Sequence, residues 1–357
     1  MARNRVIYQS EAVFVGPIAS TPVQMRRVQS CNYNFAIERT DINQFGELAS
    51  LERLILTEPT VSVDLSYYFD PSLTNEGTLG LLASTSVHAL SSIASGTTAA
   101  GEKNIFIGTS AVGSDANVSG SYAGTFEGVI GIGNSFLSSW SLEAAVGAIP
   151  TVSCAFEGQN IRFGTSLLDN PSISTGGAAL ANLATLATVT AYVNTEVVAI
   201  RPGNVTVLLG ATQNDNTPIF GFSELDLKFQ SATVSVTLSR EPIRKLGQSF
   251  AFSRELTFPI MCTMSVTAMV GEQLGGLTSL LSLMAATGDQ AKYTCQLTLV
   301  GNPASGSSVI TAIVAIKGAK LNSQNTTSSI GANKSITVEL SAQAGKDSGL
   351  FISTATT

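Results

Sequence analysis

The chain is short of charge and has a single histidine. Only 12% of its 357 residues are Asp, Glu, Lys or Arg, about half of the roughly 25% that is typical of soluble domains. The 19 basic and 25 acidic residues give a formal net charge of −6. Proteins that bind nucleic acids hold the phosphates with clustered Lys and Arg, so this composition argues against that class. The lone His88 also excludes catalytic mechanisms and zinc sites that need two imidazoles.

Motifs of metal, redox and cofactor chemistry are missing as well. The four cysteines show no CxxC spacing, so we expect reduced and mostly buried thiols instead of a zinc or redox site. They are Cys31, Cys154, Cys262 and Cys295. Glycines recur at residues 128–133, but a dinucleotide loop also needs a parallel sheet and a following helix. We interpret these glycines as permitting a tight strand turn and His88 as a structural residue. The sequence therefore predicts no enzyme, no cofactor and no metal site.

A membrane-spanning segment is not predicted either. Residues 170–195 carry no charge, but Gly, Pro and many polar residues interrupt them, and their apolar part is too short to cross a bilayer. The chain is nevertheless 44% hydrophobic. Because interfaces between permanent subunits are apolar and poor in charge, we expect an oligomer.

Two stretches of the chain repeat each other. Residues 28–69 align with residues 229–270 when the numbering is shifted by 201. In both stretches apolar and polar residues alternate, which is the period of a strand. The apolar positions that coincide in the first such strand are Tyr33, Phe35 and Ile37 in one copy and Val234, Val236 and Leu238 in the other. A slip of one residue would turn every side chain to the wrong face, so the agreement supports a true repeat.

A second correspondence lies near the ends of the two halves. Residues 137–156 align with residues 321–340 at a shift of 184, and each stretch runs into an alternating strand. Helix signals are sparse, with short helices expected at Ser86–Ser95 and Leu277–Ala285.

The chain is therefore predicted to be mainly β, with two tandem units of β-sandwich or barrel type. We place the units at residues 1–165 and 218–357. Residues 166–217 form the connecting segment, and their first part is rich in Ser, Thr, Ala and Gly.

Arginines recur at equivalent places in the two stretches. They are Arg39 and Arg53 in the first copy and Arg240 and Arg254 in the second. A guanidinium at the end of a strand can hold a carboxylate or carbonyl of a neighbouring unit, and an exposed surface charge is the alternative. Gly46 and Gly247 lie between the arginines of each copy and indicate a turn position that favours glycine.

The stretch VQSCNYNFAIERTDINQFGELASLERLILTEPTVSVDLSYYF, followed by NEGTLGLL, resembles a bacteriophage tail tube (major tail) protein. The later segments GAIPTVSCAFEGQNI, AIRPGNVTV and LSREPIRKLGQSFAFSRELTFPI are similar to the two-domain version of this family. The resemblance covers most of the chain and rests on patterns of strands and turns.

The resemblance implies that six β units, each with a flanking helix, form a ring whose inner strands close into one barrel around a channel. Such rings stack into the tube through which the genome passes. A chain with two units would form a homotrimer with pseudo-sixfold symmetry. Its partners would be further copies, the tape measure and terminator proteins, the sheath in sheathed tails, and viral DNA that passes without specific binding. It would be assembled in the host cytoplasm and located in the virion tail.

The polar faces of the predicted strands are the candidates for the channel wall. They are rich in Ser, Thr and Asn and contain no Lys, and a neutral to acidic wall lets DNA slide because it does not attract phosphates. The candidate lumen-facing residues are Asn32, Asn34, Glu38, Ser62, Asp64, Ser66, Thr233, Ser235, Thr237, Thr263, Ser265 and Thr267. The recurring arginines are the candidates for contacts between units. The alternative function is a capsid-associated or adhesin-like β-sandwich surface protein, which would form discrete oligomers.

Overall fold

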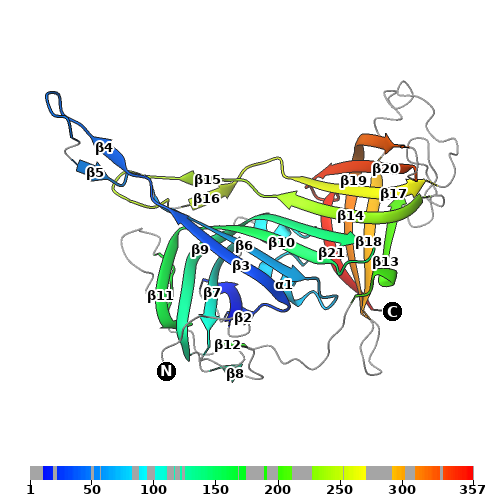
Figure 1. Ribbon diagram of the computed structural model, residues 1–357, viewed down its shortest axis with the longest axis horizontal. Helices are drawn as coiled ribbons and strands as arrows, with labels where there is room; N and C mark the ends of the chain where they lie inside the picture. Colours follow the sequence, from blue (N-terminus) through cyan, green and yellow to red (C-terminus); the bar gives the residue numbers. More distant parts are fainter. Residues whose placement is uncertain are drawn as a thin grey trace.

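A computed structural model gives the fold of the chain (Figure 1). It describes residues 11–18, 22–49, 52–56, 58–82, 88–94, 101–110, 116, 121–122, 125–167, 169–173, 189–190, 200–210, 227–251, 253–270, 292–301, 310–329 and 333–356. The described chain is mainly β, with two short helices, α1 (Thr74–Leu79) and α2 (Ser91–Ala94), and one 3-10 turn, η2 (Pro202–Asn204).

Long and short strands follow one another in both halves of the chain. Those of the first half are β1 (Glu11–Pro17), β2 (Val23–Gln24), β3 (Val28–Ala36), β4 (Thr40–Ile42), β5 (Glu52–Leu54), β6 (Thr60–Tyr68), β7 (Glu102–Thr109), β8 (Ser121–Tyr122), β9 (Thr125–Ala145), β10 (Thr151–Gly158) and β11 (Asn160–Ser166). Those that follow are β12 (Val189–Thr190), β13 (Val205–Gly210), β14 (Leu227–Thr237), β15 (Arg240–Ile243), β16 (Ser253–Leu256), β17 (Met261–Val270), β18 (Tyr293–Gly301), β19 (Ile310–Thr327), β20 (Ser335–Gln343) and β21 (Gly349–Thr356).

One large antiparallel sheet runs through both halves of the molecule. From edge to edge its strands are ordered β3–β6–β10–β9–β14–β17–β20–β19. The pairing of β9 with β14 joins the two halves. The long strands β9 and β19 also extend into a second layer, where their first parts pair with β7 and β11 and with β18 and β21. The alternation of apolar and polar residues explains the two layers, because each strand of the large sheet turns its apolar face toward the second layer.

The strand register of the first half recurs in the second half. The pair Glu157–Phe136 in β10 and β9 corresponds to Ser341–Lys320 in β20 and β19 at the shift of 184. Even the bulge between the two strands falls at equivalent residues, next to Leu137 and Leu321. The β3–β6 and β14–β17 pairs agree in the same way at the shift of 201. This recurrence concerns the pairing of the strands, and the unit boundaries 1–165 and 218–357 stay a prediction.

The core lies between the large sheet and the second layer and is continuous across both halves. Val63 and Val234 of the large sheet and Ile105 and Leu297 of the second layer are 0% exposed, as is Trp140 near the junction of the halves. Burying each such side chain contributes roughly 1.5–3 kcal/mol. The core therefore fixes which face of the large sheet remains outside.

Two hairpins leave the body on the same side of the molecule. Strands β4 and β5 form the first, and β15 and β16 form the second, in equivalent registers. Figure 1 shows the first hairpin extending away from the body at the upper left, while the second runs along the upper margin of the first half. Gly46 and Gly247 in their turns have φ of 94° and 84°, the left-handed region in which glycine is favoured.

Several sequence predictions need correction. No sheet closes into a barrel among the described residues, because β3 and the last part of β19 each have a partner on one side. The glycines of residues 128–133 form no turn, since they lie inside β9. They instead allow close packing, because a Cβ on Gly133 would collide with the backbone carbonyl group of Pro171.

The helix predictions have mixed outcomes. Helix α1 was not predicted from the sequence. It ends at Leu79, and Gly80 caps its C-terminus with φ of 82°. Helix α2 lies within the expected range Ser86–Ser95, of which residues 88–94 are described. The expected helix at Leu277–Ala285 lies outside the described residues, as does most of the connecting segment 166–217.

Candidate assembly edges and sheet face

The outer edge of the large sheet at β3 exposes apolar side chains. Tyr33, Phe35 and Ile37 are 36%, 47% and 42% exposed. Their counterparts in β14, Val234, Val236 and Leu238, are at most 2% exposed. The sequence pattern is the same in both strands, but β14 lies between β9 and β17 whereas β3 pairs with β6 alone in the described chain. The apolar side chains along β3 are therefore covered less within one chain than their counterparts in β14.

The opposite edge of the large sheet is the last part of β19. Residues 322–327 pair with β20 on one side, and most of their side chains are exposed. The counterpart of this segment is the last part of β9, which pairs with both β10 and β14. Each open edge thus corresponds to a strand that is paired on both sides at the junction of the halves. An unpaired strand edge is a template for pairing with another chain.

The candidate lumen-facing residues come together on the outer face of the large sheet. Directly paired positions include Asn32–Asp64, Asn34–Ser62, Thr233–Ser265 and Ser235–Thr263. Hydroxyl groups bridge adjacent strands there, as between Ser235 Oγ and Thr263 Oγ1 at 2.7 Å. Ser66 and Thr267 continue the rows of this face, Thr237 pairs with Ser139 of β9, and Glu38 lies beyond the end of β3 at the base of the first hairpin.

The same face also includes β9, β10 and β20, whose residues were not among the predicted lumen-facing candidates. In β9 it continues through Ser141 and Glu143, which pair across the junction with Ser235 and Thr233 of β14. In β10 it continues through Ser153 and Glu157, which pair with β6. Their alternation with the buried residues of these strands could have revealed them. On the other side of the junction, β20 adds Glu339.

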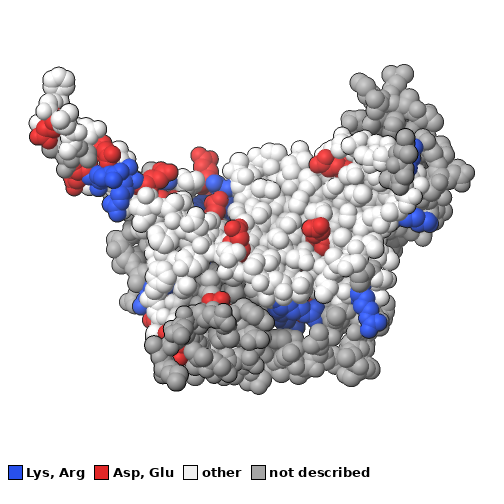
Figure 2. Space-filling model, in the orientation of Figure 1, with Lys and Arg blue, Asp and Glu red and all other residues white. Residues whose placement is uncertain are grey.

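Charge on this outer face is sparse and mainly acidic. Among the described residues, Asp64, Glu143, Glu157 and Glu339 are exposed there. Lys228 and Lys320 occupy positions at its margins, at the beginning of β14 and on the edge strand β19. Figure 2 shows scattered acidic groups on the broad surface over the large sheet, with basic groups toward its margins.

The recurring arginines have different environments in the two hairpins. In the first hairpin Arg39 is exposed, and Arg53 forms an ion pair with Asp41 on the opposite strand. In the second hairpin Arg240 lies over the ring of Phe136, with its guanidinium carbon 4.4 Å from the ring centroid. Burial lowers the pKa of Arg240 to about 10. Arg254 is 8% exposed and contacts Glu58, with Nη2 and Oε1 3.4 Å apart.

Glu58 anchors the second hairpin on the first half of the chain. Its carboxylate accepts a hydrogen bond from the Ala251 backbone N–H at 2.8 Å and also forms an ion pair with Arg244. Nearby, burial raises the pKa of Glu102, although Asn134 and the guanidinium groups of Arg254 and Arg240 act in the opposite direction. A buried carboxylate costs free energy unless it is paired, so these contacts hold the hairpin in place.

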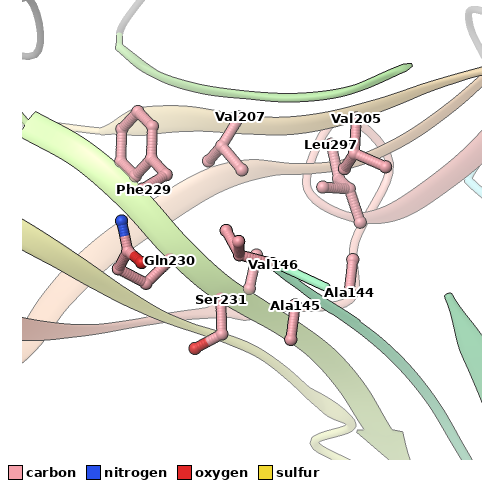
Figure 3. A pocket seen from close by; sticks show the side chains of 10 residues that line it. Ala144, Ala145, Val146, Val205, Val207, Phe229, Gln230, Ser231 and Leu297 are labelled. Atoms are coloured by element: carbon pink, nitrogen blue, oxygen red, sulfur yellow. The ribbon is translucent and has the colours of Figure 1, made fainter. Parts of the chain in front are cut away.

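A small pocket lies where the two halves meet, at the ends of β9 and β14 and beside β13 and β18. Figure 3 shows Phe229, Val207, Val205 and Leu297 lining it together with Ala144, Ala145 and Val146. Its volume of about 50 Å³ is far below the roughly 300–1,000 Å³ of small-molecule sites. We therefore assign it no ligand.

Side chains that could bind a metal ion or act in catalysis are spread over the described part of the chain. Among the residues that the structure describes, no three His, Cys, Asp or Glu side chains gather as metal ligands would. The four cysteines form no disulfide, and burial raises the pKa of Cys262 to about 11. Burial lowers the pKa of His88. No described helix has the length and hydrophobicity of a membrane span.

Comparison of the sequence with models of protein families finds no match, and a search among curated proteins finds none either.

Proposed function

We propose that the chain is a structural protein of a bacteriophage tail tube, in which three copies form a ring and the rings stack. The observation that supports this most is the equivalence of the two open sheet edges to the paired junction inside the chain. Strand β3 corresponds to β14, and the last part of β19 corresponds to the last part of β9. A second copy can therefore repeat the β9–β14 junction with these edges.

The internal junction also supplies the expected register. Within the chain, Thr233 pairs with Glu143, Ser235 with Ser141, and Thr237 with Ser139. Applying the shifts of 201 and 184 places Asn32 opposite Thr327, Asn34 opposite Asn325, and Ala36 opposite Ser323 of the next copy. Pairing in this register would cover the apolar side chains of β3, as β9 helps to cover those of β14.

Closure of the edges would turn open sheets into one barrel. Three copies of the large sheet would give a ring of about 24 strands, and barrels of 16 or more strands leave an aqueous channel. At roughly 4.8 Å between strands, the ring would be at least about 37 Å across its backbone, and strand tilt widens it. The two halves, as tandem copies of one β unit, would give pseudo-sixfold symmetry.

The outer polar face of the large sheet would become the wall of this channel. Its Ser, Thr and Asn side chains are neutral, and its described acidic residues repel phosphates, so the face has few cations that could hold DNA. These acidic residues are Asp64, Glu143, Glu157 and Glu339. DNA carries about one negative charge per 1.7 Å of axis and is held by neutralising cations, so this wall would favour sliding. The partners would be further copies and the other tail proteins, in the virion tail after assembly in the host cytoplasm.

Blocking the β3 edge tests the proposal. Phe35→Lys places a charge on the side of β3 that the next copy would cover, a substitution that natural edge strands use to prevent pairing. Because Phe35 is 47% exposed, the stability of the single chain should change by about 0.5 kcal/mol. The concentration needed for ring formation should rise by roughly tenfold or more, as measured by sedimentation velocity.

The matched control is Phe163→Lys on β11. Phe163 is 61% exposed and lies on β11, which pairs with β9 in the second layer and with neither of the edge strands β3 and β19 among the described residues. This variant should form rings as the unmodified chain does. Equal assembly of the Phe35→Lys variant and the unmodified chain would refute pairing through β3.

A further inference from the structure

The junction between β9 and β14 combines small and large side chains on its buried face. Val236 of β14 lies directly opposite Trp140 of β9, and Val234 lies opposite Leu142. All four side chains are at most 1% exposed. Side chains at directly opposite positions on one face of a sheet are in contact. Strand β14 is therefore small where β9 is large, and together they fill the space at the junction.

The two open edges of the large sheet carry the reverse order of sizes. On β3 the counterparts of the two valines are the larger Tyr33 and Phe35. On the last part of β19 the counterparts of the two large residues of β9 are the smaller Gln324 and Thr326. If β3 of one copy pairs with β19 of another in the register of the internal junction, Phe35 lies opposite Gln324 and Tyr33 opposite Thr326. Large side chains then meet small ones again, with the roles of the two strands exchanged.

The exchange of sizes disfavours the other combinations of these strands. Strand β3 on β9 would set Phe35 against Trp140, two large side chains that overpack the junction. Strand β14 on β19 would set the small Val236 against Gln324 and leave a void. Each strand thus fits its own partner better than the equivalent strand of the other junction, which is specificity by shape.

The amide of Gln324 points to the same partner. Its Oε1 is buried and has no hydrogen-bond partner among the described residues. In the register above, Tyr33 of the next copy lies diagonally across from Gln324, within reach of a long side chain, and its hydroxyl group is a hydrogen-bond donor. A buried acceptor without a partner costs free energy, so this contact would favour assembly.

From the exchanged sizes and the unpartnered amide we infer that β3 of one copy selects the last part of β19 of the next copy, through Phe35 with Gln324 and Tyr33 with Thr326. This inference rests on the proposed ring and identifies the residues that choose the partner strand. The contact concerns residues 32–36, before the chain leaves the large sheet toward the first hairpin. Because β3 would not replace β14 on β9, first and second halves would alternate around the ring.

An exchange of sizes at the Phe35–Gln324 pair tests the inference in the full chain. Phe35→Val leaves a void and Gln324→Trp overpacks the junction, so each variant should raise the concentration for half-assembly of rings by roughly tenfold, as measured by sedimentation velocity. The double variant recreates the internal pair Val236–Trp140 and should return the value to within about threefold of the unmodified chain. Independent effects would instead multiply to roughly a hundredfold, and that result would overturn the inference.

Asn325→Trp is the matched control, because it places the same side chain one residue further along β19, on the opposite face of the sheet. Adding Phe35→Val should not improve assembly of this variant. Equal improvement would mean that Val at residue 35 favours assembly whatever lies opposite, which contradicts a specific pair. Urea unfolding of each unassembled variant shows whether the chain still folds.

A cross-link identifies the partner strand even if Gln324→Trp prevents folding. Asn34 and Asn325 are exposed and would lie opposite each other across the contact, at a separation that a disulfide can span. A mixture of the Asn34→Cys and Asn325→Cys variants should form a covalent dimer on mild oxidation, whereas neither variant alone nor the unmodified chain should do so.

Two results of the cross-linking would overturn the inference. A covalent dimer of the Asn34→Cys variant alone would show that β3 pairs with β3. Rings of the mixture that yield no cross-link would show that β3 pairs with a strand other than β19, or in another register. Absence of rings from the unmodified chain would instead refute the proposed function.

Discussion

At the scale of single residues, the carboxyl group of Glu76 lies inside the core of the first half. The side chain is 0% exposed, and Tyr67 Oη donates a hydrogen bond to its Oε1 at 3.0 Å. Burial raises the pKa of Glu76 to about 7, against an ordinary value of 4.5. The folded chain therefore holds a proton at pH values where the unfolded chain has lost it.

This raised pKa makes stability depend on pH. The contribution of Glu76 is fully present below about pH 4.5 and is lost as the pH rises through 7, because the unfolded state then binds fewer protons than the folded state. At about 1.4 kcal/mol per pKa unit, the loss amounts to roughly 3 kcal/mol. Glu76→Gln cannot ionise, so its free energy of unfolding should fall less between pH 5 and pH 8.

Urea unfolding of the unassembled chain at several pH values measures this difference. Glu241→Gln, at an exposed position of β15, provides the control and should keep the pH dependence of the unmodified chain. If the Glu76→Gln variant keeps it too, Glu76 is ionised in the folded protein and the account of its burial is wrong.

At the scale of elements, the second hairpin (β15 and β16) is held on the first half by a contact between Arg254 and Glu58, which are 196 positions apart in sequence. Glu58→Gln keeps the shape of the side chain but removes the charge that faces Arg254 and Arg244. Breaking a buried ion pair is costly because it leaves an uncompensated charge. We expect the protected amides of residues 240–256 to exchange hydrogen faster by roughly tenfold or more, while those of β18 stay unchanged.

Hydrogen exchange followed by mass spectrometry resolves these segments. Glu52→Gln, the same substitution at an exposed position of the first hairpin, should leave hydrogen exchange in the second hairpin unchanged. Unchanged exchange in the Glu58→Gln variant would mean that the contact with Phe136 and the strand pairing alone hold the second hairpin on the first half.

The elements also show what local sequence patterns can and cannot predict. Period-two alternation predicted strands at β3, β6, β14 and β17 and the polar face that they share, because side-chain parity is a local property. It could not predict that Val236 is buried and Phe35 half exposed, since this depends on which distant strand lies alongside. The partner of Arg254 was hidden for the same reason: nothing near Glu58 in sequence indicates a hairpin from the other half.

At the scale of the whole molecule, the proposed ring depends on a single geometric idea. A chain whose internal junction and two open edges are equivalent should continue the same junction between copies until the sheet closes. Closure removes every free strand edge, whereas a junction with another curvature would leave an open, unlimited assembly. A closed ring is therefore the central claim of the proposal, and the six units per ring that the resemblance implies set its number of chains at three.

End-on class averages of the purified protein by negative-stain microscopy, combined with the mass of the ring, measure that number directly. The account predicts a hollow ring of three chains with six similar lobes, which stacks into tubes. Solid particles without a channel, or a closed ring with a number of chains other than three, would contradict it.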